Sequence, residues 1–332
     1  MHPSLQSIAA CVFTTLVASV GAGCGDGDGE SSSGEPPTQA PPAADFPEPG
    51  PGSIDEFIAE VGETNEIVAF PSGGVFTPGK TARFGFGLFD VAGPQIDDAD
   101  VAVYFQDVKG GETQGPYTAR TESLEVQSPY KAESALEGDT SIVYVADVPL
   151  EEPGQQRVVA VVRDSEGNFA ATNFQTVIDV RDQPGIPAEG EPVPSISTPT
   201  FDDVGDVSEI DTRVPPSTMH EEDLADVLGE KPAVLLFATP ALCQSRVCGP
   251  VVDVSEQVKA EYGDEAAFIH MEIYQDNQYD PKKPKLRPQV EEFGLFTEPW
   301  LFVIDESGKV QTRIEGAFSV TELEDALQAV TG

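Results

Sequence analysis

The chain is poor in the residues that most often carry out chemistry. Its 332 residues include only four cysteines, three histidines and one tryptophan. Basic residues are also scarce, since 18 lysines and arginines face 58 aspartates and glutamates, which gives a formal net charge of -40. Such a charge repels nucleic acid and anionic membrane surfaces, so we expect no nucleic-acid partner. The acidity fits a protein that works outside the cell, and a saline habitat would explain it equally well.

Motifs for several common chemistries are missing. The sequence has no phosphate-binding loop, no Ser-His-Asp order and no cysteine spacing of the zinc type. We therefore expect neither a cofactor nor a metal. A length of 332 residues predicts two domains, at about 150 residues each.

The first 24 residues are typical of an export signal. Residues 8–20 are apolar and form too short a run to span a bilayer as a mature helix. The run ends in Gly21-Ala22-Gly23-Cys24, which resembles the lipobox of bacterial lipoproteins. The resemblance implies that Cys24 carries lipid and anchors the exported protein at the extracytoplasmic face of the cell membrane. A simple secretory signal is the alternative.

A tether and an all-β region are expected next. Residues 25–52 have almost nothing to bury and predict a disordered tether. Residues 53–181 hold a short amphipathic helix at 54–61, then short β-branched or aromatic runs separated by turns. The expected strands are 66–70, 82–89, 101–105, 141–145, 157–162 and 172–178. This pattern favours an immunoglobulin-like β-sandwich, whose role would be binding, spacing or interaction.

A second, α/β domain follows a Pro-rich linker. The linker is expected at 182–216, and its last residues, from Ile210 to Pro216, are expected to pack on the domain at 217–332. Expected helices are 224–228, 251–262, a short one through Val290 and Phe293, and 320–330. Expected strands are 233–237, 267–273, 299–305 and 310–315. This order combines a parallel crossover with a terminal hairpin.

Two cysteines lie on the turn between the first strand and the first long helix of this domain. A helix N-terminus favours a thiolate, and Arg246 between Cys243 and Cys248 adds to that effect. Cys11 is lost with the signal, and if Cys24 carries lipid, the other two can pair only with each other. Because disulfides persist outside the cytoplasm, the pair can form one.

The second domain resembles the thioredoxin fold over about its last 115 residues. Cys248-Gly249-Pro250 matches three quarters of the Cys-Gly-Pro-Cys motif, at the start of the first long helix. Glu298-Pro299 stands before a strand, where the family has its cis-proline, and the strands 300–305 and 310–315 match the closing hairpin. The resemblance implies that Cys248 is the attacking cysteine, supported by its neighbours in the motif. It also implies that a cis Pro299 leaves the backbone of Glu298 free to pair with a bound peptide.

The chain departs from the thioredoxin motif at its second cysteine. Val251 stands there, and Cys243, five positions upstream of Cys248, offers a partner instead. In the first hypothesis the protein is a thiol-disulfide oxidoreductase, in which Cys248 attacks and Cys243 resolves. Its partners would be the thiols or disulfides of exported proteins and a redox partner protein.

Two other hypotheses stay open. In one, the protein is a non-catalytic binding or scaffold lipoprotein whose Cys243–Cys248 disulfide is structural, worth only about 2 kcal/mol for so short a ring. In the other, the thiolates bind Cu(I) with a distant histidine, as in the Sco copper chaperones. His270 is the only histidine downstream, and a packed core residue is the commoner explanation for it. We expect His220, which stands before a helix, to be solvated or to cap that helix.

Overall fold

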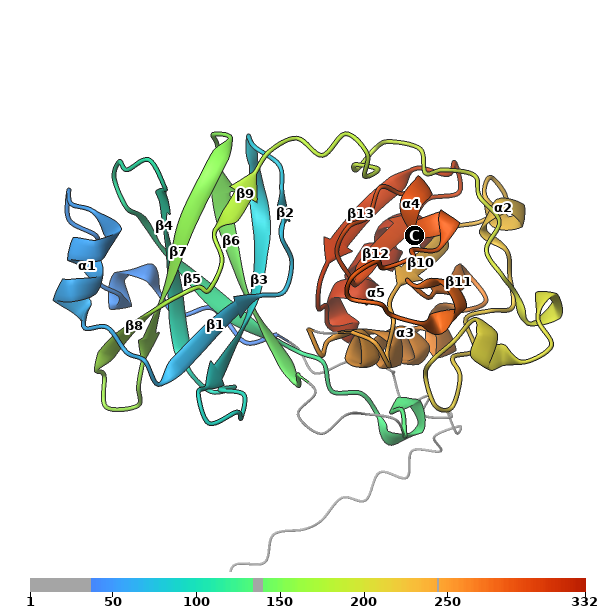
Figure 1. The fold of residues 1–332 in the computed structure, drawn as a ribbon, viewed down its shortest axis with the longest axis horizontal. Coiled ribbons are helices and arrows are strands. Elements are labelled where there is room, and N and C mark those ends of the chain that lie inside the picture. The colour runs from blue at the N-terminus through green and yellow to red at the C-terminus, as the bar shows by residue number, and fades with distance from the viewer. Residues whose placement is uncertain (1–36, 134–139, 244) are drawn as a thin grey trace, which may run out of the picture. The chain divides into compact units, whose positions relative to one another are not determined.

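A computed structural model of the chain describes residues 37–133, 140–243 and 245–332 (Figure 1). The predicted signal, the lipobox with Cys24 and the first part of the predicted tether lie outside the described residues. Within those described ranges, every helix is too short or too polar to cross a membrane.

The first part of the described chain is all-β. One short helix, α1 (Ile54–Val61), comes before the strands. The strands are β1 (Ile67–Pro71), β2 (Val75–Phe76), β3 (Lys80–Asp90), β4 (Asp100–Asp107), β5 (Gln114–Ser123), β6 (Ile142–Leu150), β7 (Gly154–Arg163), β8 (Phe169–Asn173) and β9 (Ile178–Val180). Their order in the sheet is β1-β3-β6-β5-β4-β7-β9-β2, and β8 pairs with β7. The prediction of an all-β region is therefore confirmed.

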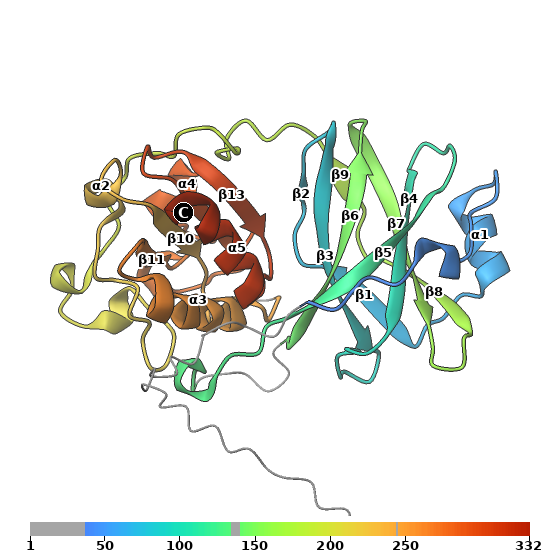
Figure 2. The same cartoon turned by 180° about the vertical axis from the view of Figure 1, so that it is seen from behind.

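Strand β5 joins the two halves of this sheet. Its first residues pair with β4, as Tyr117 does with Val103, and its last residues pair with β6, as Ala119 does with Ala146. The view from behind shows β5 as the long strand between β4 and β6 (Figure 2). The sheet is thus continuous and curls around one apolar core that includes Phe84. Two separate sheets of the immunoglobulin type stay a prediction.

The described part of the predicted tether, residues 37–52, contacts the all-β region at a few residues. Phe46 is buried, and the guanidinium carbon of Arg163 lies 5.6 Å from the centre of its ring. The backbone N–H of Thr38 donates to the carbonyl of Thr121 at 3.0 Å, which holds this segment beside β5. Phe46 thus supplies an apolar anchor that the average composition of the segment hides, and a disordered tether over residues 25–52 stays a prediction.

The predicted linker also packs as part of the fold. Ile186 and Val193 are buried, and Pro192 pairs with Lys309 next to the last strand of the chain. Residues 182–216 therefore form an arm that packs along the second part of the molecule. We had expected such packing only at the end of this segment, from Ile210 to Pro216. Where one domain ends and the next begins stays a prediction of the sequence.

The second part is an α/β structure with a four-stranded sheet. Its strands are β10 (Ala233–Phe237), β11 (Ala267–Met271), β12 (Trp300–Ile304) and β13 (Val310–Glu315). Its helices are α2 (Leu224–Val227), α3 (Cys248–Tyr262), α4 (Pro288–Glu292) and α5 (Val320–Thr331). The strand order is β11-β10-β12-β13, with β10 parallel to β11 and antiparallel to β12. The chain also makes 3-10 turns at Ala43–Asp45, Ser128–Tyr130, Phe201–Asp203, Val207–Glu209 and Gln275–Asn277.

Alternate residues of β10 enter two different apolar cores. Val234 and Leu236 pack with α3 and α5, whereas Leu235 and Phe237 pack with residues of α2 and α4. All five residues of β10 are buried, as expected for a central strand covered by helices on both faces. The predicted order of helices and strands, including the terminal hairpin, is therefore confirmed and is the order that the thioredoxin resemblance implies.

Candidate functional site

Cys243 and Cys248 form a disulfide on the loop between β10 and α3. Their Cα atoms lie 5.9 Å apart, within the usual range for such a bond. Helix α3 begins at Cys248 itself, three residues earlier than predicted. Val247 occupies the N-cap position and offers no side-chain acceptor to the first amides of the helix. The N-terminal end of α3, at Cys248, favours negative charge on the sulfur of this residue.

The two cysteines differ in their access to solvent. Cys248 is 0% exposed and lies in an apolar cluster with Val247, Val251 and Val143. Cys243 is half-buried, and its sulfur lies 3.2 Å from the hydroxyl of Ser245. An incoming group can therefore reach the sulfur of Cys243 more easily than that of Cys248.

Backbone hydrogen bonds hold the loop that carries Cys243. The N–H groups of Leu242 and Cys243 both donate to the carbonyl of Thr239, at 3.1 and 3.0 Å. The N–H of Ala241 donates to the hydroxyl of Thr212 at 3.1 Å. The cysteine is thus presented on a turn that is fixed to the end of β10 and to the packed arm.

The supporting residues predicted from the motif lie around the disulfide. Gly249 and Pro250 are half-buried in the first turn of α3. Arg246 is exposed on the loop between the cysteines, with a positive φ of 59°. Its charge is therefore close in sequence to both sulfurs and remains in contact with solvent.

Pro299 has the cis peptide bond that the resemblance implies, directly before β12. The preceding residue, Glu298, accepts hydrogen bonds from the hydroxyl of Tyr274 at 3.3 and 3.2 Å. Burial, together with the negative charge of Glu272, raises the pKa of Glu298 despite that hydrogen bond. Glu298 thus contributes a half-buried side chain as well as the backbone groups that the sequence singled out.

An apolar cleft adjoins the disulfide loop. It has a volume of about 570 Å³ and is lined by Ser245, Arg246 and Val247 on the loop side. Its other wall includes Phe70 and Val91, which are 47% and 66% exposed. A large apolar side chain placed in this cleft would lie next to the residues that separate the two cysteines.

A buried polar group that the sequence did not reveal lies behind the loop. Oδ2 of Asp211 lies 3.1 Å from His220 Nε2 and accepts a hydrogen bond from the backbone N–H of Ser217 at 2.7 Å. His270 Nε2 lies 3.1 Å from the carbonyl oxygen of Ala238, and its Nδ1 lies 3.2 Å from the hydroxyl of Ser217. His270 is thus a buried residue, as expected, but with polar partners.

The expectation for His220 is wrong. It is 1% exposed rather than solvated, and Asp223 caps helix α2 instead. No sequence signal reveals its partner, because Asp211 stands in a segment whose composition is that of a linker. The ring nitrogens of His270 face Ser217 and Ala238 at hydrogen-bond distance, and the Sco-like set of two thiolates and this histidine stays a prediction.

Asp211, His220 and His270 influence one another's pKa values. Burial favours the neutral form of Asp211, yet the neighbouring His270 and the hydrogen bond from His220 hold the pKa of Asp211 well below its ordinary value. Burial lowers the pKa of His220. Burial opposes a charge on His270 too, but Asp211 raises its pKa above the ordinary value.

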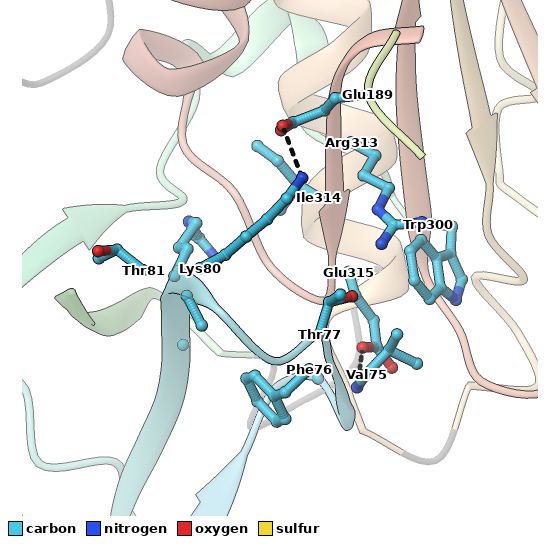
Figure 3. A pocket seen from close by; sticks show the side chains of 14 residues that line it. Val75, Phe76, Thr77, Lys80, Thr81, Glu189, Trp300, Arg313, Ile314 and Glu315 are labelled. Atoms are coloured by element: carbon cyan, nitrogen blue, oxygen red, sulfur yellow. Dashed lines mark hydrogen bonds and ion pairs between the residues drawn. The ribbon is translucent and has the colours of Figure 1, made fainter. Parts of the chain in front are cut away.

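A second pocket, of about 220 Å³, contains no pair of groups suited to nucleophilic chemistry (Figure 3). Lys80 lies 3.8 Å from Glu189 across it, and the backbone of Val75 donates to Glu315 at 2.6 Å. Trp300 lines this pocket but is only 1% exposed and stacks on Phe302, so it acts as a core residue.

Comparison with known proteins gives only distant likenesses. No protein-family model matches the chain, and no curated protein matches it. A solved structure described as the thiol:disulfide interchange protein DsbE from Chlorobium tepidum is 17% identical, covers 44% of this chain and 99% of its own, and has a TM-score of 0.32. A thioredoxin family thiol:disulfide interchange protein from Chlorobium tepidum TLS is 18% identical, covers 44% of this chain and 100% of its own, and has a TM-score of 0.29. Likenesses at this level establish neither fold nor function, which therefore rest on the residues of the chain itself.

Proposed function

We propose that the protein exchanges disulfides with the thiols of exported proteins, through Cys243 and Cys248. One observation carries this proposal: the disulfide joins a half-buried cysteine on a loop to a cysteine at the start of a long helix. The first gives access to a partner, and the second gives a stabilised leaving group.

In this proposal Cys243 is the sulfur that a substrate attacks, because it is the more accessible of the two. A substrate thiolate attacks the sulfur of Cys243, a mixed disulfide forms, and the bond to Cys248 breaks with its electron pair left on Cys248 as a thiolate. A second substrate thiol then attacks the substrate sulfur, forms the substrate disulfide and releases Cys243 as a thiolate that takes up a proton. The substrate loses two electrons and the protein gains them, and a redox partner protein of suitable potential restores the disulfide.

The reverse direction uses the same sulfurs. In the reduced protein the Cys243 thiolate attacks a substrate disulfide, and Cys248 then attacks Cys243 to release the reduced substrate. These roles are the opposite of those that the thioredoxin resemblance implies, because burial of Cys248 counts against it as the attacking group.

The cleft supports a polypeptide as the substrate. Its apolar wall suits a large apolar side chain near the substrate cysteine, which a small thiol lacks. The cis Pro299 and the backbone of Glu298 are, in this proposal, the second contact for an extended peptide.

An insulin-reduction assay tests the activity. With dithiothreitol as the reductant, the wild-type chain is expected to accelerate the reduction of insulin, and Cys243→Ser and Cys248→Ser are expected to lose that acceleration. Equal and near-zero acceleration by all three proteins would overturn the proposal.

Location outside the cytoplasm is part of the same proposal. It is supported by the apolar run at 8–20 and by the lipobox-like residues that end at Cys24. Mass spectrometry of the mature protein is expected to find a lipidated N-terminal Cys24 and a mass two hydrogens below that of the reduced Cys243–Cys248 pair. An unmodified N-terminus that retains residues 8–20 would contradict export.

A structural disulfide is the second candidate, and the burial of Cys248 favours it. In that case the protein is a binding or scaffold protein, and the bridge only orders its loop. The two candidates differ in the reduction potential that each requires.

A further inference from the structure

Two of the three histidines in the whole chain meet at one buried carboxylate. Asp211, His220 and His270 are 2%, 1% and 0% exposed. Oδ2 of Asp211 lies 3.1 Å from Nε2 of His220 and 3.5 Å from Nδ1 of His270. All three donor atoms lie within 4.8 Å of one another. This group stands apart from the disulfide and takes no part in the exchange proposed above.

Hydrogen bonding determines which nitrogen of His270 faces the carboxylate as an acceptor. Its Nε2 lies 3.1 Å from the carbonyl oxygen of Ala238, which can only accept, so Nε2 carries a proton. In the neutral ring Nδ1 is then an acceptor, and it faces Asp211 Oδ2, a second acceptor. Nδ1 can then either accept a hydrogen bond from the hydroxyl of Ser217, 3.2 Å away, or bind a cation that it shares with Oδ2.

A second imidazole faces the same carboxylate oxygen. His220 Nε2 lies 3.1 Å from Oδ2 of Asp211. A metal ion between the three side chains would use one nitrogen of each ring and the carboxylate together.

The spacing of the donor atoms fits a small transition-metal ion. Ligands about 2.0–2.2 Å from a tetrahedral zinc ion lie about 3.3 Å from one another, close to the 3.1 and 3.5 Å found around Asp211. The hydroxyl of Ser217, 3.2 Å from His270 Nδ1, is near enough to supply a fourth ligand. The carbonyl of Ala238 would orient His270 for this role by accepting a hydrogen bond from its Nε2. A ligating histidine usually donates its other N–H to a carbonyl or carboxylate in this way.

The position of the ligands indicates a structural rather than a catalytic site. Asp211 and His220 come from a segment without regular structure beyond one 3-10 turn before Asp211, and His270 comes from β11. A metal ion would therefore fasten this segment to the sheet. Because none of the ligands contacts solvent, the ion would enter as the chain folds and leave no open position for substrate.

We propose that Asp211, His220 and His270 bind one divalent transition-metal ion of the zinc class, as a closed structural site. The full chain is the material for the test. Metal analysis of protein purified without chelator is expected to find one zinc per chain. Protein unfolded with EDTA and refolded with Co²⁺ is expected to bind one equivalent and to show the visible absorption of tetrahedral cobalt.

Matched variants locate the ion. Because removal of a direct ligand is expected to weaken binding by roughly 100-fold or more, His220→Gln and His270→Gln should lose the cobalt absorption. The double variant Cys243→Ser, Cys248→Ser should keep it, since thiolates are not ligands in this proposal. Cobalt absorption that follows the cysteines rather than the histidines would overturn the assignment.

If the histidine variants fail to fold, measurements on the wild-type chain alone still test the proposal. No bound metal, no uptake of Co²⁺ and a melting temperature unchanged by EDTA would overturn the proposal. Nitrogen-15 chemical shifts of His270 that report protons on both ring nitrogens at neutral pH would do so as well, since the cation would then be a proton.

Discussion

The hydroxyl of Thr212 donates a hydrogen bond of 2.6 Å to Oε1 of Glu272 and accepts one of 3.1 Å from the backbone of Ala241. The side chain of Thr212, which belongs to the arm at 182–216, therefore contacts both the buried Glu272 and the loop that carries Cys243. The backbone N–H of Thr212 donates to the same carboxylate oxygen at 2.8 Å, so the contact is made twice. Thr212 is thus the residue through which the loop carrying Cys243 is fastened to the interior.

Thr212→Val should loosen that loop. The substitution keeps the shape of the side chain but leaves Ala241 N–H and part of Glu272 without a partner, which costs about 1–3 kcal/mol of unfolding free energy. Urea denaturation measures the loss, and hydrogen exchange at Leu242 and Cys243 is expected to become faster. Thr218→Val is a matched control, because Thr218 bonds Glu256 at an exposed position. Equal effects of the two substitutions would contradict the role of Thr212.

Single-cysteine variants should differ in reactivity. In Cys248→Ser the remaining Cys243 is half-buried, whereas in Cys243→Ser the remaining Cys248 is 0% exposed. We expect Cys243 to react with an aromatic disulfide reagent at least about tenfold faster, because access limits the reaction. The absorbance of the released thiolate gives both rates. Faster reaction of Cys248 would restore the roles implied by the thioredoxin motif.

Val91→Ser should separate polypeptide from small-molecule exchange. Val91 is 66% exposed on the wall of the cleft, so its replacement should not disturb the core. We expect kcat/KM for insulin to fall by roughly threefold to tenfold, as for a lost apolar contact of about 1 kcal/mol, while exchange with glutathione is unchanged. Val177→Ser is the control, because Val177 is 46% exposed and does not line the cleft. A loss of activity toward both substrates would count against the cleft as a substrate contact.

Asp305 should contribute stability that disappears in acid. Burial disfavours its ionised form, but hydrogen bonds from the backbone of Lys309 and from Ser307 and Gln311 outweigh that and lower its pKa to about 2. A carboxyl whose folded pKa is depressed stabilises the fold above its unfolded pKa, here 3.8, and that contribution is lost as pH falls from about 4 to about 2. NMR titration of the carboxyl measures the folded pKa.

Asp305→Asn supplies the matching stability measurement. The difference in unfolding free energy between wild type and variant is expected to be constant at neutral pH and to shrink as pH falls through the same window. A difference that stays unchanged down to pH 2 would show that the turn does not depend on the charge of Asp305.

The sequence predicted elements well where apolar residues are continuous and poorly where side chains are polar. The runs at β10 and β12 are buried from end to end, so their hydrophobicity alone indicates central strands. Strand β5 was missed, because it begins Gln114-Gly115-Pro116 and continues with polar residues. Its position between β4 and β6, rather than its own composition, makes it a strand.

Predictions for the site were limited in a similar way. The turn with both cysteines before a long helix follows from local sequence and the cis bond at Pro299 from the thioredoxin resemblance, and both are present, although the helix begins three residues earlier than predicted. The burial of Cys248 depends on residues as distant as Val143, which no local pattern reports. The meeting of Asp211 with His270 likewise depends on how an irregular segment packs, and Pro-rich composition gives no sign of it.

Redox equilibration with glutathione distinguishes a Cys243–Cys248 disulfide that exchanges from one that is structural. The fraction of the Cys243–Cys248 disulfide, followed by mass spectrometry after alkylation over a range of glutathione ratios, gives the reduction potential of the pair. If the protein exchanges disulfides, we expect glutathione to reduce the Cys243–Cys248 disulfide reversibly. Its reduction potential should then lie well above about -300 mV, in the range of known exchange proteins. A potential below about -300 mV, with no reduction by glutathione, would contradict the account and identify the bridge as structural.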